Sequence, residues 1–244
     1  MEISKNPLIN YGQKAYNCIL GHKKEAILAT SLVLGAIALV VGYSFYKEGL
    51  QRRAQKDLVE ALRSFDAPVH GAGLKDEELN LDAEFFTSDK EKWTKVVEIF
   101  KQGYQKNKSA GIASLFLAYQ AQALINLGDL ELAVKALNMA VGSMPESSAR
   151  SFYKVKTALV SMDTGKKELQ EQGLQSLKAI ALDTNNTANP MALYYLGQHY
   201  RNAKDFNEAK NYWNQLVLKY GKTTQKPSVW AQKAKKYLKL VSVK

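Results

Sequence analysis

The sequence feature that most constrains this chain is an uncharged apolar stretch near its N-terminus. Residues 26–45 read AILATSLVLGAIALVVGYSF, with no Asp, Glu, Lys or Arg. At about 1.5 Å of rise per residue, a helix of this length spans roughly 30 Å, which is the hydrocarbon thickness of a bilayer. The stretch therefore predicts a transmembrane anchor over residues 26–46, preceded by a leader of residues 1–25.

A cleaved signal peptide is the alternative interpretation of the same stretch. The leader and the apolar stretch are both longer than a signal peptide requires. Bulky side chains also stand where small residues would precede a cleavage site: Tyr43, Phe45 and Tyr46. We therefore expect the anchor to be retained. The Lys and Arg residues are balanced on its two sides, so the positive-inside rule does not decide its orientation.

Small residues recur along one side of the predicted anchor. Ser31, Gly35, Ala38 and Gly42 are spaced by four, three and four residues, which places them on one face of a helix. Small residues let a second helix approach closely. Two interpretations stay open: docking against another membrane protein, or the ordinary composition of a membrane helix.

The formal net charge of +11 is concentrated at the C-terminal end. Residues 1–46 carry +2, residues 47–218 carry +1, and residues 219–244 carry eight lysines and no acidic residue. A nucleic-acid-binding domain spreads its basic residues over a binding surface, so this distribution argues against nucleic acid as a partner. The 46% of hydrophobic residues suffices for a packed core, and a single cysteine allows no internal disulfide.

Helical periodicity dominates after the anchor. Apolar residues form a stripe over residues 47–65, so we expect the anchor to run into this helix without a break. A less helical segment with Pro and Gly completes a juxtamembrane region of residues 47–87. Ser88 and Glu91 have the spacing of a capping box and predict the start of the next helix.

Two later segments share one helical-hairpin pattern. Residues 115–145 read LFLAYQAQALINLGDLELAVKALNMAVGSMP, and residues 190–221 read PMALYYLGQHYRNAKDFNEAKNYWNQLVLKYG. Both resemble tetratricopeptide repeats (TPR), whose pattern is W-x2-L-G-x2-Y, then A-x3-F, then P. The second segment keeps the L-G-x2-Y part as Leu196, Gly197 and Tyr200. Such hairpins stack into a solenoid because none of them buries its apolar face alone.

The repeat recurs along the chain at nearly constant spacing. A small or apolar residue marks the second helix of each unit, at Val96, Ala133, Gly173 and Ala209, with separations of 37, 40 and 36 residues. A small side chain at this position lets the two helices of one hairpin approach each other. Repeats are therefore predicted over residues 88–226.

These features together predict an all-α fold. A single N-terminal transmembrane helix precedes a TPR-type α-solenoid of about four helical hairpins. A capping helix over residues 227–244 closes it, with Trp230 and Tyr237 on its inner face. Its lysines form a basic patch: Lys233, Lys235, Lys236 and Lys239. We expect the patch on the face opposite the aromatic residues, either simply solvated or in contact with anionic lipid or an acidic partner.

The sequence contains no pattern typical of catalysis. The histidines, His22, His70 and His199, have no neighbours at metal-ligand spacing, and Cys18 is remote from the body of the chain. The tract from Gly221 to Thr224 imitates the end of a phosphate-binding loop, but it follows a helix where that motif needs a strand. We therefore expect no enzymatic activity, no cofactor and no metal site.

The first helix of each repeat lines the concave groove of a TPR solenoid. In the two best-matched units the predicted groove residues are Gln122, Ile125, Asn126, Tyr194, Gln198, Arg201 and Asn202. Their mixture of aromatic and amide groups suits an extended peptide or a partner helix, although the same residues could be ordinary surface. The positions at which carboxylate-binding repeats carry Lys and Asn hold other residues, so that mode of recognition is not expected.

The layout resembles the YfgM-like family of bacterial inner-membrane proteins. The resemblance rests on the order of leader, span, continuing helix and repeats, and on the segments KWTKVVEIFKQGYQKN, AYQAQALINLGDLELAVKAL and DFNEAKNYWNQLVLKYG. Members of that family are ancillary subunits of the SecYEG translocon, act beside a periplasmic PpiD-type chaperone and expose their repeats to the periplasm. The resemblance implies the same role, an inner-membrane location and a periplasmic C-terminal domain.

Two functions therefore stay open. The first is a membrane-tethered interaction scaffold that links the Sec translocon to periplasmic chaperones. The second is a structural TPR scaffold of another envelope complex, such as a secretion or motility machine, with one fixed partner.

Overall fold

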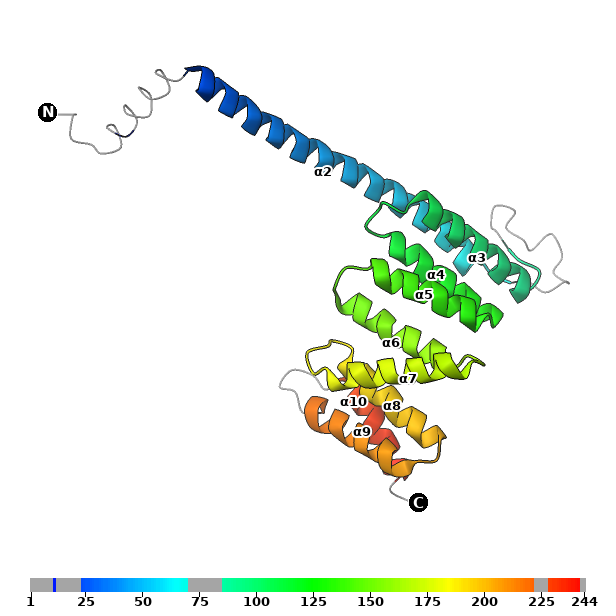
Figure 1. Ribbon diagram of the computed structural model, residues 1–244. Coiled ribbons are helices and arrows are strands. Elements are labelled where there is room, and N and C mark those ends of the chain that lie inside the picture. Colours follow the sequence, from blue (N-terminus) through cyan, green and yellow to red (C-terminus); the bar gives the residue numbers. More distant parts are fainter. Residues whose placement is uncertain (1–10, 12–22, 70–84, 222–227, 242–244) are drawn as a thin grey trace. The chain divides into compact units, whose positions relative to one another are not determined.

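The computed structural model describes residue 11 and residues 23–69, 85–221 and 228–241. These residues form nine α-helices and no β-strand, with one isolated β-bridge between Val69 and Phe86. The helices are α2 (Lys23–Asp66), α3 (Asp89–Lys106), α4 (Ala113–Leu127), α5 (Leu130–Ser143), α6 (Ser148–Met162), α7 (Lys167–Leu182), α8 (Asn189–Asn202), α9 (Phe206–Tyr220) and α10 (Val229–Val241). The described part of the chain is all-α, as predicted (Figure 1). Most of the leader, with Cys18 and His22, lies outside the described residues, as do His70 and residues 222–224 of the loop-like tract.

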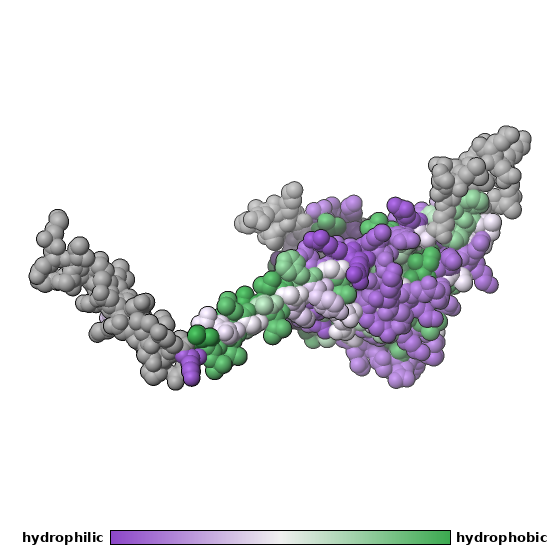
Figure 2. Space-filling model, turned by 90° about the horizontal axis from the view of Figure 1, so that it is seen from above, coloured by the Kyte–Doolittle hydropathy of each residue, from purple (hydrophilic) through white to green (hydrophobic). Residues whose placement is uncertain are grey.

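Helix α2 is continuous over its whole length, which confirms that the apolar stretch and the juxtamembrane helix form one element. The chain divides into two compact units, Met1–Arg52 and Arg53–Lys244, and α2 contributes to both. In the first unit the large apolar side chains of α2 are exposed, for example Ile27, Leu39 and Phe45. Figure 2 shows this part of α2 mostly in green. Among the described residues, α2 is the one helix long and apolar enough to cross a membrane.

In the second unit, each helix from α3 to α9 packs against the next helix in the chain, and α10 also contacts α8. The connections are short; only Gly128 and Asp129 separate α4 from α5. Short connections favour antiparallel neighbours, because the chain must reverse within a few residues. Helices α3 to α9 accordingly stack in chain order, and α10 packs against both α8 and α9 (Figure 1).

The predicted helix starts and turns are found close to the expected residues. Ser88 caps α3, and its hydroxyl accepts a hydrogen bond from the Glu91 backbone N–H at 3.2 Å. The Glu91 carboxylate accepts from the Thr87 backbone N–H at 3.0 Å, one residue earlier than in a standard capping box. Gly128 ends α4 with φ of 83°, a left-handed conformation that glycine adopts without steric cost. Asp205 caps α9 by accepting from the Glu208 backbone N–H at 3.1 Å.

Small residues set the distance between paired helices. A Cβ added to Gly173 on α7 would lie 2.5 Å from the Ala158 carbonyl oxygen of α6, so only glycine fits there. A Cβ on Gly197 of α8 would overlap the indole of Trp213 on α9. The four residues that mark the repeats in the sequence, Val96, Ala133, Gly173 and Ala209, are all buried. Their burial confirms that these positions face the packed interior.

Polar contacts join the C-terminal part of α2 to α3. The Asp57 carboxylate accepts a hydrogen bond from the Asn107 side-chain amide at 2.9 Å and pairs with Lys106 at 3.0 Å. The Lys92 ammonium donates to the Ala67 carbonyl oxygen at 2.6 Å, just beyond the end of α2. Aromatic packing of Phe65 against Trp93, Phe100 and Tyr119 adds an apolar layer beside these contacts.

A buried asparagine connects three consecutive helices in the C-terminal half. The side chain of Asn189 is fully buried at the start of α8. Its amide N–H groups point to carbonyl oxygens at the end of α7, those of Ile180, Ala181 and Asp183, at 3.2, 2.8 and 3.1 Å. Its carbonyl oxygen accepts a hydrogen bond from the Tyr220 hydroxyl of α9 at 2.8 Å. Asn189 therefore satisfies carbonyl groups that a helix end leaves without partners.

Candidate interaction sites

The predicted groove residues of α4 form a polar face together with α6. The Gln122 side-chain amide donates a hydrogen bond to the Asn126 side-chain oxygen at 3.2 Å. The Lys156 ammonium of α6 donates to the Gln122 oxygen at 2.7 Å. Asn126 is exposed, whereas Ile125 is half-buried and packs against the core beneath. The structure thus unites Gln122 and Asn126 with Lys156, a residue absent from the predicted set.

Lys156 is unusual because it is half-buried without a carboxylate partner among the described residues. Its ammonium lies 5.9 Å from the centre of the Tyr153 ring and donates a hydrogen bond to the Gln122 side-chain oxygen. Burial lowers the pKa of Lys156, because the charged form loses hydration. Burial also raises the pKa of Tyr153, with a smaller effect from Tyr119. The face therefore holds a positive charge that the described residues do not neutralise.

A periodic signal could have identified Lys156 from the sequence. It follows Gln122 by 34 residues, and α6 starts at Ser148, 35 residues after the start of α4 at Ala113, so the two residues hold nearly equivalent positions on the first helices of neighbouring units. Equivalent positions of successive repeats lie side by side on the same face of a solenoid, so the two side chains were candidates for contact. A position-by-position comparison of neighbouring repeats would therefore have paired Lys156 with Gln122.

Three of the predicted groove residues of α8, Tyr194, Gln198 and Arg201, are in a different situation, because they lie at the contact with α10. Tyr194 was expected to line an open groove, but it is 8% exposed, so this prediction is wrong. Its ring lies 5.3 Å from that of Trp230 and 6.2 Å from that of Tyr237, both on α10. The reason is that the last hairpin has no following repeat, and α10 packs in that place. Tyr194 therefore belongs to the core.

Two further predicted residues of α8, Gln198 and Arg201, contact aromatic side chains where α8 and α10 meet. The Gln198 side-chain amide donates to the Tyr194 hydroxyl at 2.9 Å, and the Arg201 guanidinium lies 4.7 Å from the Tyr237 ring centre. Hydrogen bonds from Gln198, Arg201 and Tyr194 lower the pKa of Tyr237. Asn202 is exposed and accepts from Arg201 at 3.1 Å. Of the predicted α8 residues, only Asn202 has an exposed side chain.

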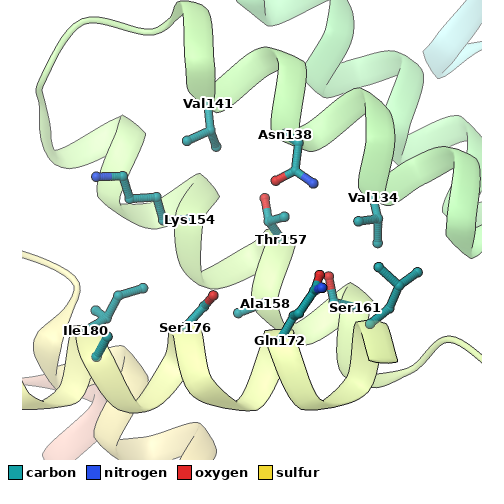
Figure 3. Close-up of a pocket in the computed structure, with 13 residues that line it drawn as sticks. Val134, Asn138, Val141, Lys154, Thr157, Ala158, Ser161, Gln172, Ser176 and Ile180 are labelled. Carbon is teal, nitrogen blue, oxygen red and sulfur yellow. The ribbon is translucent and has the colours of Figure 1, made fainter. Parts of the chain in front are cut away.

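A cleft of about 330 Å³ lies on the side of α5 and α7, with α6 as its floor. Figure 3 shows Asn138 of α5 and Thr157 of α6 pointing toward each other, with Gln172 of α7 beside Ser161. Apolar side chains of Val134 and Ile180 complete the lining. A second cleft repeats this arrangement one unit earlier, between α3 and α5 with α4 below. These clefts were not predicted, because they depend on the spacing of helices from different repeats.

The basic patch on α10 is partly engaged with the protein itself. Lys233, Lys235, Lys236 and Lys239 all have exposed side chains. The Lys233 ammonium lies 4.8 Å from the centre of the Trp230 ring, so the prediction that this lysine faces away from Trp230 is wrong. The Lys235 ammonium donates to the Gly221 carbonyl oxygen at 3.3 Å. A long flexible side chain can reach around the helix toward an aromatic ring, which a count of helix positions does not reveal.

The small-residue face of α2 is exposed along its length in the first unit. Ser31, Gly35, Ala38 and Gly42 are all exposed. A Cβ added to Gly35 or Gly42 would meet no atom of the chain within 4 Å. Docking of another membrane helix on this face stays a prediction.

Titratable groups with metal-ligand chemistry are sparse in the described part of the chain. No group of three or more His, Cys, Asp or Glu side chains comes together among the residues that the structure describes. His199 is half-buried, and burial together with the nearby Lys178 lowers its pKa. Its ring packs edge-on against Tyr200 at 5.3 Å. His199 thus lies in an aromatic packing contact.

Comparisons with protein-family models, with curated proteins and with solved structures found no match to this chain. The described structure defines an all-α protein with one helix capable of spanning a membrane.

Proposed function

We propose that this chain is a membrane-tethered protein–protein interaction scaffold. Residues 26–46 anchor it in a membrane. The exposed apolar surface of α2 in the first unit supports the anchor, because soluble proteins rarely leave such a large apolar surface in water. A bilayer covers these side chains and needs no hydrogen bonds from them.

The second unit forms a TPR-type α-solenoid of about four hairpins with a C-terminal capping helix. Three observations support this assignment: the packing of each helix on the next, the burial of the four repeat-marking residues, and the 34-residue relation between Gln122 and Lys156. Solenoids of this kind bind partners along an extended face, which suits a scaffold.

The polar face of Gln122, Asn126 and Lys156 is the observation that carries the binding function. A half-buried lysine without a carboxylate costs hydration, so it does little for stability. Its amide neighbours present donors and acceptors of the kind that pair with the backbone of an extended peptide. A bound chain would occupy this face and complete the hydrogen bonding of Lys156.

The resemblance of the layout to the YfgM-like family suggests which machine the scaffold serves. We propose that the chain is an ancillary subunit of the Sec translocon in a bacterial inner membrane. Its repeats lie on the periplasmic side and link the translocon to a PpiD-type chaperone. A structural subunit of another envelope complex, with one fixed partner, is the alternative outcome of the tests below.

Site-specific photo-crosslinking tests the binding face directly. A photoreactive amino acid replaces the exposed Asn126 on the polar face, and a matched variant carries it at the exposed Asn214 on α9. We expect the Asn126 variant to crosslink a translocon subunit and several unfolded client chains, whereas the Asn214 variant does not. A single stoichiometric partner without any translocon subunit would instead identify another envelope complex.

A topology measurement tests the location. Reporter fusions at Lys244 distinguish a periplasmic C-terminus, active as a phosphatase fusion, from a cytoplasmic one, fluorescent as a reporter that folds only in the cytoplasm. We expect the phosphatase to be active. A cytoplasmic C-terminus would overturn the periplasmic role and leave the anchored scaffold in place.

A further inference from the structure

One side of helix α10 packs against the protein, and the opposite side is exposed. Ala231 and Ala234 are fully buried against α8 and α9. At 100° per residue, Lys236 and Lys239 lie on the outer side of the helix. Both lysines are exposed. The helix therefore has an inner face that packs and an outer face that is free of packing contacts.

Two large apolar side chains share this outer face with the lysines. Val229 is 62% exposed and Leu240 is 66% exposed. They lie about three turns apart and therefore on the same side of α10; Lys236 lies between them along the helix and within about 40° of both on the helical wheel. A face that served only to keep the end of the stack soluble would carry polar residues at these two positions. The combination of lysines with exposed apolar residues needs another explanation.

The charge on this face is not compensated by the described part of the chain. Lysines elsewhere form ion pairs, such as Lys106 with Asp57 and Lys166 with Glu131. No carboxylate among the described residues lies within ion-pair distance of Lys236 or Lys239. Their segment, residues 219–244, contains no acidic residue that could neutralise them locally.

We propose that the outer face of α10, formed by Val229, Lys236, Lys239 and Leu240, is a contact surface for an anionic phospholipid bilayer. Lysines are attracted to the negative surface of such a bilayer, and apolar side chains enter the boundary between headgroups and acyl chains. Free phosphate would engage the ammonium groups but would gain nothing from Val229 or Leu240. This surface is additional to the anchor and to the peptide-binding face on α4 and α6.

An environment-sensitive fluorophore on α10 reports the contact. The full chain with Cys18→Ser and Gln232→Cys carries one label near the middle of the outer face. The protein is reconstituted in vesicles of phosphatidylcholine alone or with added phosphatidylglycerol. A matched label at Met139→Cys, exposed on α5, is the positional control. Flotation of the protein with the neutral vesicles measures the insertion of the α2 anchor independently of the α10 label.

We expect a blue shift of the α10 label only in the anionic vesicles, lost when salt rises from about 0.05 M to about 0.5 M. Lys236→Glu with Lys239→Glu should reduce the fraction of labelled protein whose α10 contacts the bilayer by roughly tenfold or more. Lys90→Glu with Lys95→Glu, the same charge change on α3, should leave it unchanged. Circular dichroism verifies that each variant stays helical.

A second variant separates lipid contact from simple charge attraction. Val229→Gln with Leu240→Gln keeps every lysine, and we expect it to abolish most of the blue shift. An unchanged shift in this variant, or equal behaviour of neutral and anionic vesicles, overturns the proposal. A shift caused by soluble poly-glutamate but not by anionic vesicles would assign the face to an acidic protein. Suppression by inorganic phosphate at constant ionic strength would reduce it to a phosphate-ion site; both results also overturn the proposal.

Discussion

Asn189 shows how much one buried polar residue contributes to a stack of helices. Its side chain bonds carbonyl oxygens at the end of α7 and the hydroxyl of Tyr220 on α9. Each hydrogen bond contributes only a modest net free energy to stability. Removing one, however, leaves a buried polar group that has lost its hydration and has no hydrogen-bond partner in return. The junction of α7, α8 and α9 therefore depends on this amide.

Asn189→Leu should destabilise the second unit by about 2–4 kcal/mol, because several buried carbonyls and the Tyr220 hydroxyl lose their partner. Urea unfolding followed by circular dichroism measures the change. The exposed Asn185 provides the matched control, and Asn185→Leu should change stability by less than about 0.5 kcal/mol. Equal effects of the two substitutions would contradict this role for Asn189.

Asp57 gives the junction of α2 and α3 a dependence on pH. The hydrogen bond from Asn107, assisted by Lys106, holds the pKa of Asp57 below its ordinary value of 3.8. A carboxyl group whose pKa is lower in the folded state stabilises the fold above its unfolded pKa. That stabilisation is lost as pH falls through the folded pKa.

The melting temperature of the wild-type chain should therefore exceed that of Asp57→Asn at neutral pH, and the difference should shrink between about pH 4 and about pH 2. Thermal unfolding of both proteins across this range provides the measurement. As a control, Asp163→Asn alters an exposed carboxylate at the C-cap of α6. A wild-type advantage that persists at the acid end would contradict the assignment.

At the scale of elements, glycine determines how closely α6 and α7 pair. An added Cβ at Gly173 would meet the backbone oxygen of Ala158, which cannot move without displacing the helix. At Gly197 on α8, the missing side chain makes room for a large side chain instead of a backbone: the indole ring of Trp213 on α9 occupies the space. The same small position is Ala on α5 and α9, where a methyl group is accommodated.

Gly173→Ala should therefore destabilise the chain by about 1–3 kcal/mol, even though alanine is the better helix former. The control is Gly142 on α5, where an added Cβ meets no atom within 4 Å. There the same substitution should stabilise the helix by roughly 0.5 kcal/mol. Chemical denaturation of both variants checks the sign, and stabilisation by Gly173→Ala would contradict the close pairing of α6 and α7.

At the scale of the whole molecule, α10 protects the end of the second unit. It covers Tyr194 and contacts Trp213 and Leu216, which would otherwise face water. Its own alanines are buried by the same contact. The last hairpin thus depends on a helix outside the repeat pattern, as terminal repeats generally need a cap with a polar outer side.

A chain ending at Pro227 should lose this cap, expose Trp213 and aggregate or bind a hydrophobic dye, because a contiguous apolar surface becomes accessible. Tryptophan emission and light scattering measure both effects. Truncation after Val241 is the control, since it keeps all of α10. A monomeric shortened chain with unchanged tryptophan emission would show that α10 is dispensable.

Much of the fold could be predicted because it is written in local patterns. The continuity of α2, the cap at Ser88, the turn at Gly128 and the last helix all follow from neighbouring residues. The candidate sites were less predictable. The sequence indicated Gln122 and Asn126 but missed Lys156, and it placed Tyr194 in a groove that α10 in fact covers.

The sequence by itself determined that the chain is helical, where its long apolar helix lies and which positions face the interior. These properties depend on periodicity, and periodicity is a local property of the chain. Only the tertiary structure decided which polar residues meet. Lys156 beside Gln122, Asn189 at the end of α7 and Lys233 over Trp230 each join side chains brought together by packing. Such contacts depend on distances between helices, which no single helix encodes.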